Sequence, residues 1–170
     1  RLMSQLAREA EIQQSLFDGS KAVLEGGDFA ATARHIFDAA RAMTGARSGY
    51  VALLSDDGEE NELLFLEAGG LPCAVDPDLP MPVRGLRAEA YRTGQAVFDN
   101  DFMNSRWAEY MPPGHAILRN VLFSPLNIEG KTVGIIGLAN KPEDFGEEDR
   151  RIAVAFGQLA AIALRNSRMR

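Results

Sequence analysis

The sequence has little of what metal and disulfide sites need: one cysteine, Cys73, and two histidines, His35 and His115. A single cysteine excludes a disulfide within the chain and a metal site built from several cysteines. Neither histidine has a second ligand at metal-binding spacing, so the sequence does not indicate a histidine metal cluster.

Long apolar runs are also missing. No stretch approaches the ~20 apolar residues of a transmembrane helix, and the first residues, RLMSQLARE, resemble a charged helix rather than a secretory signal. The net charge of -6 argues against a nucleic-acid or anionic-membrane surface, although a few local donors could still bind a small anion. We expect a cytoplasmic protein.

Motifs of the common catalytic sites are absent as well. The chain has no Walker-type phosphate loop and no Gly-x-Ser-x-Gly. The carboxylates between Asp56 and Glu62 are best interpreted as the solvated tip of a hairpin. We therefore expect no catalytic residues and no enzyme activity in this domain.

At 170 residues the chain has the length of one domain with a sizeable core. Apolar spacing and glycine stops predict helices and strands in a mixed order. The predicted helices are 1–18, 29–44, 85–93 and 147–168, and the predicted strands are 48–54, 62–68, 95–98, 121–128 and 131–139. Asp28 is the expected N-cap of the second helix and Gly45 its stop.

The strands 121–128 and 131–139 meet at Glu129-Gly130 and predict a hairpin. In the second of them Ile135 points one way and Ile136 the other, which predicts a central strand covered on both faces. Gly134 and Gly137 mark close approach of another element. Helix packing on the sheet and a ligand are both open explanations.

The first helix carries a heptad-like series of residues. It consists of Met3, Leu6, Ala10, Gln13 and Phe17. The helix either packs on the domain or arrives from an upstream domain and pairs with its twin. We divide the chain into a linker and dimerisation helix (1–18), a domain (19–167) and an extension toward a downstream domain (168–170).

Two segments in the middle of the chain could form a lid. The loop 69–83 is rich in proline and contains Cys73, which is more simply incidental than catalytic. Aromatic residues gather between 101 and 114 and either pack on the sheet or line a pocket. His115 either caps its Pro-Gly turn or, with Arg119 and Asn120, presents donors to a small anionic or polar ligand.

Several motifs resemble those of the GAF domain, a small-molecule sensing module. They are GLRAEAYRTGQAVFDND, PPGHAILRNVLFSPL, LANKP and FGEED. The chain is most similar to GAF modules of bacterial sensor histidine kinases in two-component systems. It also overlaps the Asn-Lys-Phe-Asp-Glu signature of phosphodiesterase GAF domains at Asn140, Lys141, Phe145 and Asp149, with Arg150 in place of the final Glu.

The resemblance implies an α+β fold. A central antiparallel sheet of five or six strands would carry the first, second and last helices on one face and the lid on the other. It also implies a regulatory sensor domain, in which a ligand between sheet and lid shifts the terminal helices of a parallel homodimer. The alternative is a ligand-free dimerisation module whose pocket is filled by its own side chains.

Residue roles follow from the resemblance. The pocket candidates are Phe102, Trp107, Tyr110, His115, Arg119 and Asn120, and the structural latch is Asn140, Lys141, Phe145 and Asp149, with Lys141 bridging to Asp149. Arg150 weakens any cyclic-nucleotide inference. The single cysteine argues against the sulfoxide reductases of this fold and against bilin attachment near His115. Haem at His115 stays open, and no cofactor is identified.

Overall fold

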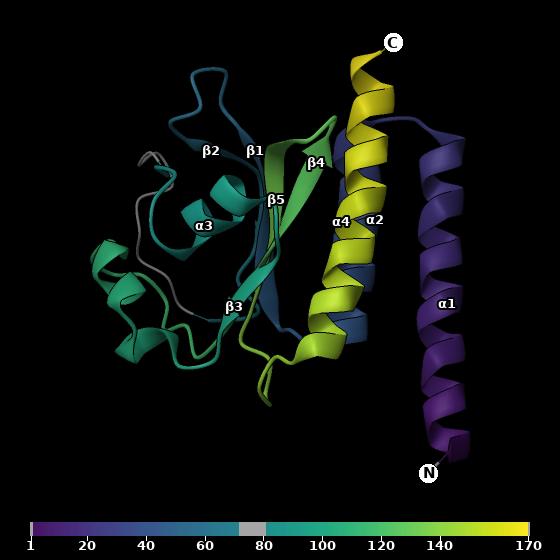
Figure 1. The fold of residues 1–170 in the computed structure, drawn as a ribbon, viewed down its shortest axis with the longest axis horizontal. Coiled ribbons are helices and arrows are strands. Elements are labelled where there is room, and N and C mark those ends of the chain that lie inside the picture. Colours follow the sequence, from purple (N-terminus) through teal and green to yellow (C-terminus); the bar gives the residue numbers. More distant parts are fainter. Residues whose placement is uncertain (1, 72–80, 170) are drawn as a thin grey trace.

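The computed structural model describes residues 2–71 and 81–169. Three long helices lie on one side of the sheet in Figure 1, as the resemblance implied. They are α1 (Leu2–Glu25), α2 (Phe29–Thr44) and α4 (Glu147–Arg168). Helices α2 and α4 cover the sheet, and α1 packs on those two helices as an outer layer.

Helix α1 continues past Asp18, where the sequence predicted its end, and stops at Glu25. Gly19 lies buried within this helix. Leu159 of α4 packs so closely here that a Cβ on residue 19 would stand only 3.0 Å from Leu159 Cδ1. Packing against α4 therefore outweighs the weak helix preference of glycine. The proposed boundary between residues 18 and 19 falls within a continuous helix and stays a prediction.

Helix α2 ends as expected at Gly45, which has a left-handed φ of 84°. Asp28 precedes the helix in extended conformation, but its side chain makes no capping hydrogen bond. Thr32 Oγ1 instead donates to the Asp28 carbonyl at 3.3 Å. The predicted N-cap position is therefore confirmed.

Five strands form one antiparallel sheet in the order β2–β1–β5–β4–β3. They are β1 (Ser48–Leu54), β2 (Asn61–Glu67), β3 (Val97–Asp99), β4 (Val121–Ile128) and β5 (Lys131–Ala139). The predicted hairpin is confirmed, since Glu129 and Gly130 join β4 to β5 with positive φ values of 51° and 79°. Strand β5 lies at the centre, between β1 and β4.

Neighbouring residues of β5 face two different cores. Ile136 and Leu138 pack under the helices, in one cluster with Phe37 of α2 and Phe156 of α4. Ile135 faces the opposite way, into the second cluster. The alternation predicted for a doubly covered strand is confirmed.

The atoms that lie closest to Gly134 and Gly137 of β5 belong to β1 and not to a helix. A Cβ at Gly137 would lie 2.9 Å from the Tyr50 ring, on the face away from the helices, and one at Gly134 would lie 2.7 Å from the β1 backbone. The helix instead approaches the sheet through its own Gly157, where a Cβ would stand 2.8 Å from the Pro125 carbonyl oxygen. The helix-packing explanation is therefore wrong for both strand glycines.

The face of the sheet opposite the long helices is covered by short elements (Figure 1). They are α3 (Leu86–Thr93) and two 3-10 turns, Phe102–Asn104 and Arg106–Tyr110. We call α3, the segment 81–83 and residues 102–118 the lid, and the side of the sheet beneath them the lid face.

The segment 81–83 runs beside the start of β2. Asn61 N donates to Met81 O at 2.8 Å, and Val83 N donates to Glu59 O at 2.9 Å. Cys73 and the middle of the proline-rich loop lie outside the described residues.

Candidate functional site

A second apolar cluster fills the space between the sheet and the lid. Its buried members are Tyr50, Ala52, Leu86, Ala90, Phe102, Val121, Phe123, Ile135 and Ala139, and Met81, Tyr91, Val97, Trp107, Met111 and Leu118 pack against them. Two polar side chains reach into this apolar surrounding with groups that have no partner, and they mark the candidate site.

Tyr50 projects from the middle of β1 and is 9% exposed. Its hydroxyl is buried and has no hydrogen-bond partner. Burial raises the pKa of Tyr50, and the nearby Arg87 guanidinium opposes this rise. Tyr50 therefore keeps its proton at neutral pH and offers a donor.

Asn61 opens β2 and is 3% exposed. Its Oδ1 accepts from the Tyr91 hydroxyl of α3, but its Nδ2 is buried without a partner. Burial, with a smaller contribution from the neighbouring Tyr50, raises the pKa of Tyr91, so that hydroxyl also stays protonated. A buried donor with no acceptor costs about 1–3 kcal/mol, and the lid face contains two of them.

Arg87 supplies the positive charge at this site. Its Nε and Nη2 donate to the Pro82 carbonyl at 3.1 and 2.8 Å, which fixes the side chain against the segment 81–83. Within the described residues, Arg87 forms no ion pair. The lid face therefore combines a half-buried cation with two neutral donors that lack acceptors.

The predicted aromatic residues divide between the interior and the rim of this site. Phe102 is buried in the cluster and Trp107 packs against it. Tyr110 is 40% exposed, with the Arg84 guanidinium 5.7 Å from its ring centroid. Arg106 lies 4.3 Å from the Trp107 ring centroid and covers its outer side.

His115 belongs to its own turn. Its backbone N–H donates to Pro112 O at 3.3 Å, and its Nδ1 lies 2.7 Å from Ala116 O. These contacts fit the expectation that His115 caps the turn. His35, the other histidine, is exposed on α2.

Arg119 and Asn120 do not present their donors to the lid face. Arg119 donates from Nη1 to Glu143 O at 2.8 Å and from Nη2 to Asp144 Oδ1 at 2.9 Å. Asn120, fully buried, donates to the carbonyls of Lys141 and Glu143 and accepts from Lys141 N at 2.9 Å. Because these groups already hold the loop 141–144, the contacts of Arg119 and Asn120 do not support their assignment to a ligand, which stays a prediction.

The latch residues lie together at the junction of β5 and α4. Lys141 Nζ lies 3.0 and 2.8 Å from the two Asp149 carboxylate oxygens, the ion pair that the resemblance implied. Asp149 also accepts from Gly146 N at 2.9 Å and so caps α4. Asn140 has a positive φ of 59°, and its Oδ1 accepts from Arg119 N at 2.8 Å.

Asn100, which the sequence did not suggest, completes this junction. It accepts from Phe145 N at 2.7 Å and donates to Phe145 O at 2.9 Å, so a buried loop residue is held on both sides. Arg150, at the position that departs from the family pattern, donates to Ala96 O at 2.9 Å and covers the Phe98 ring. It ties α4 to the β3 edge.

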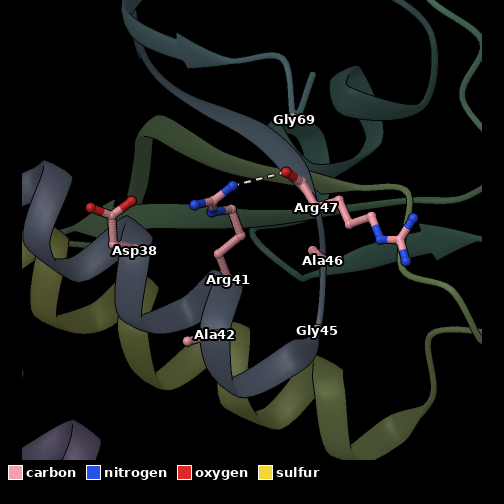
Figure 2. A pocket seen from close by; sticks show the side chains of 7 residues that line it. All are labelled: Asp38, Arg41, Ala42, Gly45, Ala46, Arg47 and Gly69. Atoms are coloured by element: carbon pink, nitrogen blue, oxygen red, sulfur yellow. Dashed lines mark hydrogen bonds between the residues drawn. The ribbon is translucent and has the colours of Figure 1, made fainter. Parts of the chain in front are cut away.

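A surface hollow of about 460 Å³ lies at the end of α2 (Figure 2). Its residues do not converge on a ligand: Arg41 donates to the Arg47 carbonyl at 2.8 Å, and the Arg47 side chain points away from it. A hollow of about 340 Å³ between Gln95 and Gln158 shares none of its lining residues with the lid-face cluster.

Two absences hold for the part of the chain that the structure describes. No helix there is long and apolar enough to cross a membrane. No group of three or more His, Cys, Asp or Glu side chains among those residues could hold a metal ion.

The polar residues of the lid face could not be predicted from the sequence. Asn61 lies at the start of a strand beside a charged turn, a place where a polar residue is ordinary. Arg87 and Tyr91 lie on a short helix whose sequence has the pattern of an ordinary amphipathic helix. Their only shared signal is spacing: residues 87 and 91 are one turn apart on a helix and so share a face. Tyr50 reads as an ordinary strand aromatic.

Solved structures of similar fold include GAF domains of larger proteins and a reductase. The GAF domain of a phosphoenolpyruvate-protein phosphotransferase from Coxiella burnetii has a TM-score of 0.79 and 15% identity, covering 94% of this chain and 96% of its own. Free methionine-R-sulfoxide reductase from Neisseria meningitidis, solved with its substrate, has a TM-score of 0.76 and 18% identity, covering 93% and 90%.

The GAF domain of a Pseudomonas syringae pv. tomato protein described as a sensor histidine kinase has a TM-score of 0.66 and 17% identity, covering 99% of this chain and 95% of its own. At these identities the similarity shows the fold alone. No curated protein matches the sequence. The family model of the GAF domain, however, matches residues 27–165, so this chain belongs to the GAF domain family.

Proposed function

We propose that this chain is the regulatory sensor domain of a cytoplasmic signalling protein and binds a small molecule between the sheet and the lid. The observation that carries the proposal is the pair of buried, unpartnered polar groups on the lid face, Tyr50 Oη and Asn61 Nδ2. A folded chain seldom leaves such groups unsatisfied without a reason, and a ligand that accepts from them supplies one.

Lid residues complete the proposed site. Phe102 and Trp107 would give apolar walls, and Tyr110 would lie at the rim. His115 stays a candidate, although it makes its hydrogen bonds within its own turn. Arg119 and Asn120 are left out, because their donors hold the loop beside them. The domain itself would carry no catalytic residue, and any enzyme activity would belong to another part of the signalling protein.

The sheet offers a direct route from the lid face to α4. On β4, Phe123 faces the lid cluster while the next residue, Ser124, donates to the Ala153 carbonyl of α4 at 2.9 Å. On β1, Tyr50 lies over Gly137 of β5, and β5 leads into the Lys141–Asp149 ion pair at the start of α4. A ligand that moves either aromatic ring would therefore bias the position of α4.

The terminal helices would pass this bias to a second copy of the chain. The residues of the heptad-like series lie exposed on the outside of α1, and Leu24 extends the series to the end of the helix. We call Met3, Leu6, Ala10, Gln13, Phe17 and Leu24 the outer seam. A parallel homodimer would cover it, as in a coiled coil.

The second candidate is a dimerisation module without a ligand. The observation in its favour is that Phe102 and Trp107 pack into the lid cluster themselves and fill space that a ligand would take. In that case α1 would perform the function of the domain, and the lid would only stabilise the fold.

Thermal unfolding separates the two candidates. The purified chain would be melted with cyclic nucleotides, amino acids, organic acids and haem, because a ligand of the native state raises the melting temperature by mass action. The sensor proposal predicts a concentration-dependent rise for one class, which is lost in Tyr50→Phe and kept in the control Arg92→Gln. A rise that is equal in both variants would place the ligand away from Tyr50 and contradict the proposed site, and no rise at all would favour the dimerisation module.

A further inference from the structure

We propose that the ligand of the lid face carries a carboxylate on an apolar body, with the carboxylate accepting from Tyr50 Oη, Asn61 Nδ2 and the Arg87 guanidinium. This inference rests on the proposed sensor function and adds the chemical class of the ligand. It comes from three groups on three elements, β1, β2 and α3.

The three groups are all donors. The Asn61 amide uses its oxygen on the Tyr91 hydroxyl, so only its N–H groups remain. Tyr50 keeps its proton because burial raises its pKa. A ligand with donors of its own would meet few free acceptors here, whereas a ligand that accepts would satisfy all three groups.

The positive charge of Arg87 indicates that the accepting group of the ligand is an anion. The segment 81–83 holds the guanidinium, because Nε and Nη2 both donate to the Pro82 carbonyl. No ion pair neutralises Arg87 within the described residues. Arginine binds planar carboxylates through paired N–H groups. One cation with neutral donors suits a singly charged carboxylate better than a doubly charged phosphate.

Apolar residues from the lid make up the remaining surface. Phe102, Trp107, Met111 and Leu118 all lie in or against the same cluster, which gives the site a wide apolar side beside a small polar one. A ligand with an aryl or alkyl body would replace contacts between these side chains, while its carboxylate would reach the donors.

Matched acids and amides test the charge requirement. Phenylacetate, indole-3-acetate and octanoate would be compared with phenylacetamide, indole-3-acetamide and octanamide by calorimetry and melting temperature. The proposal predicts that at least one acid binds about tenfold or more tightly than its amide, because a charged hydrogen bond contributes more than a neutral one.

Variants locate the effect. Arg87→Gln should remove the preference for the acid, Tyr50→Phe should weaken the acid about tenfold, and Arg92→Gln, on the exposed side of the same helix, should change neither. Tyr50→Phe keeps the ring and its packing, so it remains informative if Arg87→Gln unfolds. An amide that binds as tightly as its acid would overturn the ligand class but leave the sensor proposal standing. Binding of neither acid nor amide would overturn the ligand class, and the wider panel would then decide the sensor proposal.

Discussion

Lys141 Nζ lies 2.8 Å from Asp149 Oδ2 and joins the end of the last strand to the first turn of the last helix. Both side chains are largely buried, and Asp149 also accepts from Gly146 N. Removing one partner of such a pair leaves a charge in a poorly hydrated place.

Asp149→Ala should therefore lower the free energy of unfolding by about 3 kcal/mol, and Lys141→Met by less, because only the first also removes a helix cap. Urea denaturation measures both values. The surface pair Arg92–Glu89 is the control, and Glu89→Ala should lower the free energy of unfolding far less than Asp149→Ala does. Equal small losses for Asp149→Ala and Glu89→Ala would show that the pair does not hold α4.

Asn120→Ala should destabilise the fold rather than affect a ligand directly. The fully buried amide makes three hydrogen bonds to the backbone of residues 141–143, so we expect a loss of about 2–3 kcal/mol. Arg119→Ala, its exposed neighbour, should cost less and leave ligand affinity unchanged. A ligand affinity that falls in Arg119→Ala, at unchanged stability, would restore the assignment made from the sequence.

Gly157→Ala tests the contact between α4 and the sheet. The added methyl would stand 2.8 Å from Pro125 O and 3.1 Å from Ser124 Oγ, so α4 must shift, and we expect a loss of about 1–3 kcal/mol. Gly146→Ala is the matched control, because no atom lies within 4 Å of its Cβ position. Thermal melting of the two variants compares them, and similar melting temperatures would contradict the close contact.

The outer seam predicts the oligomeric state. Phe17→Glu and Leu6→Glu place charge on the exposed side of α1, so they should shift the chain toward monomer in light scattering while leaving the fold intact. Leu66→Glu, on an exposed position of the edge strand β2, should leave the dimer unchanged. A monomeric parent chain, or dimers that survive both seam variants, would contradict the homodimer.

Ionisation of Tyr50 and Tyr91 at alkaline pH should destabilise the folded protein. Burial raises the pKa of both side chains in the folded state, so folding favours the protonated hydroxyls. Their contribution to stability is complete below the unfolded pKa of about 10 and declines as the pH rises above it. Tyrosine absorbance and circular dichroism should change together for these residues. Ionisation of Tyr91 well before unfolding, identified by subtraction of Tyr91→Phe, would contradict its burial.

Local signals in the sequence were enough for much of the fold. The β4–β5 hairpin follows from two apolar runs around Glu129-Gly130, and the end of α2 follows from Gly45. The ion pair between Lys141 and Asp149 was predicted from the family resemblance and not from the spacing of residues. These features depend on residues that are close in the sequence or on a shared motif.

Features that depend on tertiary packing were missed. Helix α1 passes through Gly19 because α4 lies against it, and no pattern within α1 reveals that neighbour. Asn120 resembled a ligand donor in the sequence, but it serves backbone groups more than twenty residues away. Tyr50, Asn61 and Arg87 come from three elements, so only the folded chain shows that they share the lid face.

Fluorescence of Trp107, the only tryptophan, measures binding at the lid directly. The compound that most raises the melting temperature would be titrated into the wild-type chain and into Tyr50→Phe. We predict a saturable change in emission for the wild type and a much weaker titration for the variant, because the ligand packs beside Trp107 and accepts from Tyr50. An unchanged Trp107 signal at concentrations that stabilise the protein would place the ligand elsewhere and contradict the proposed site.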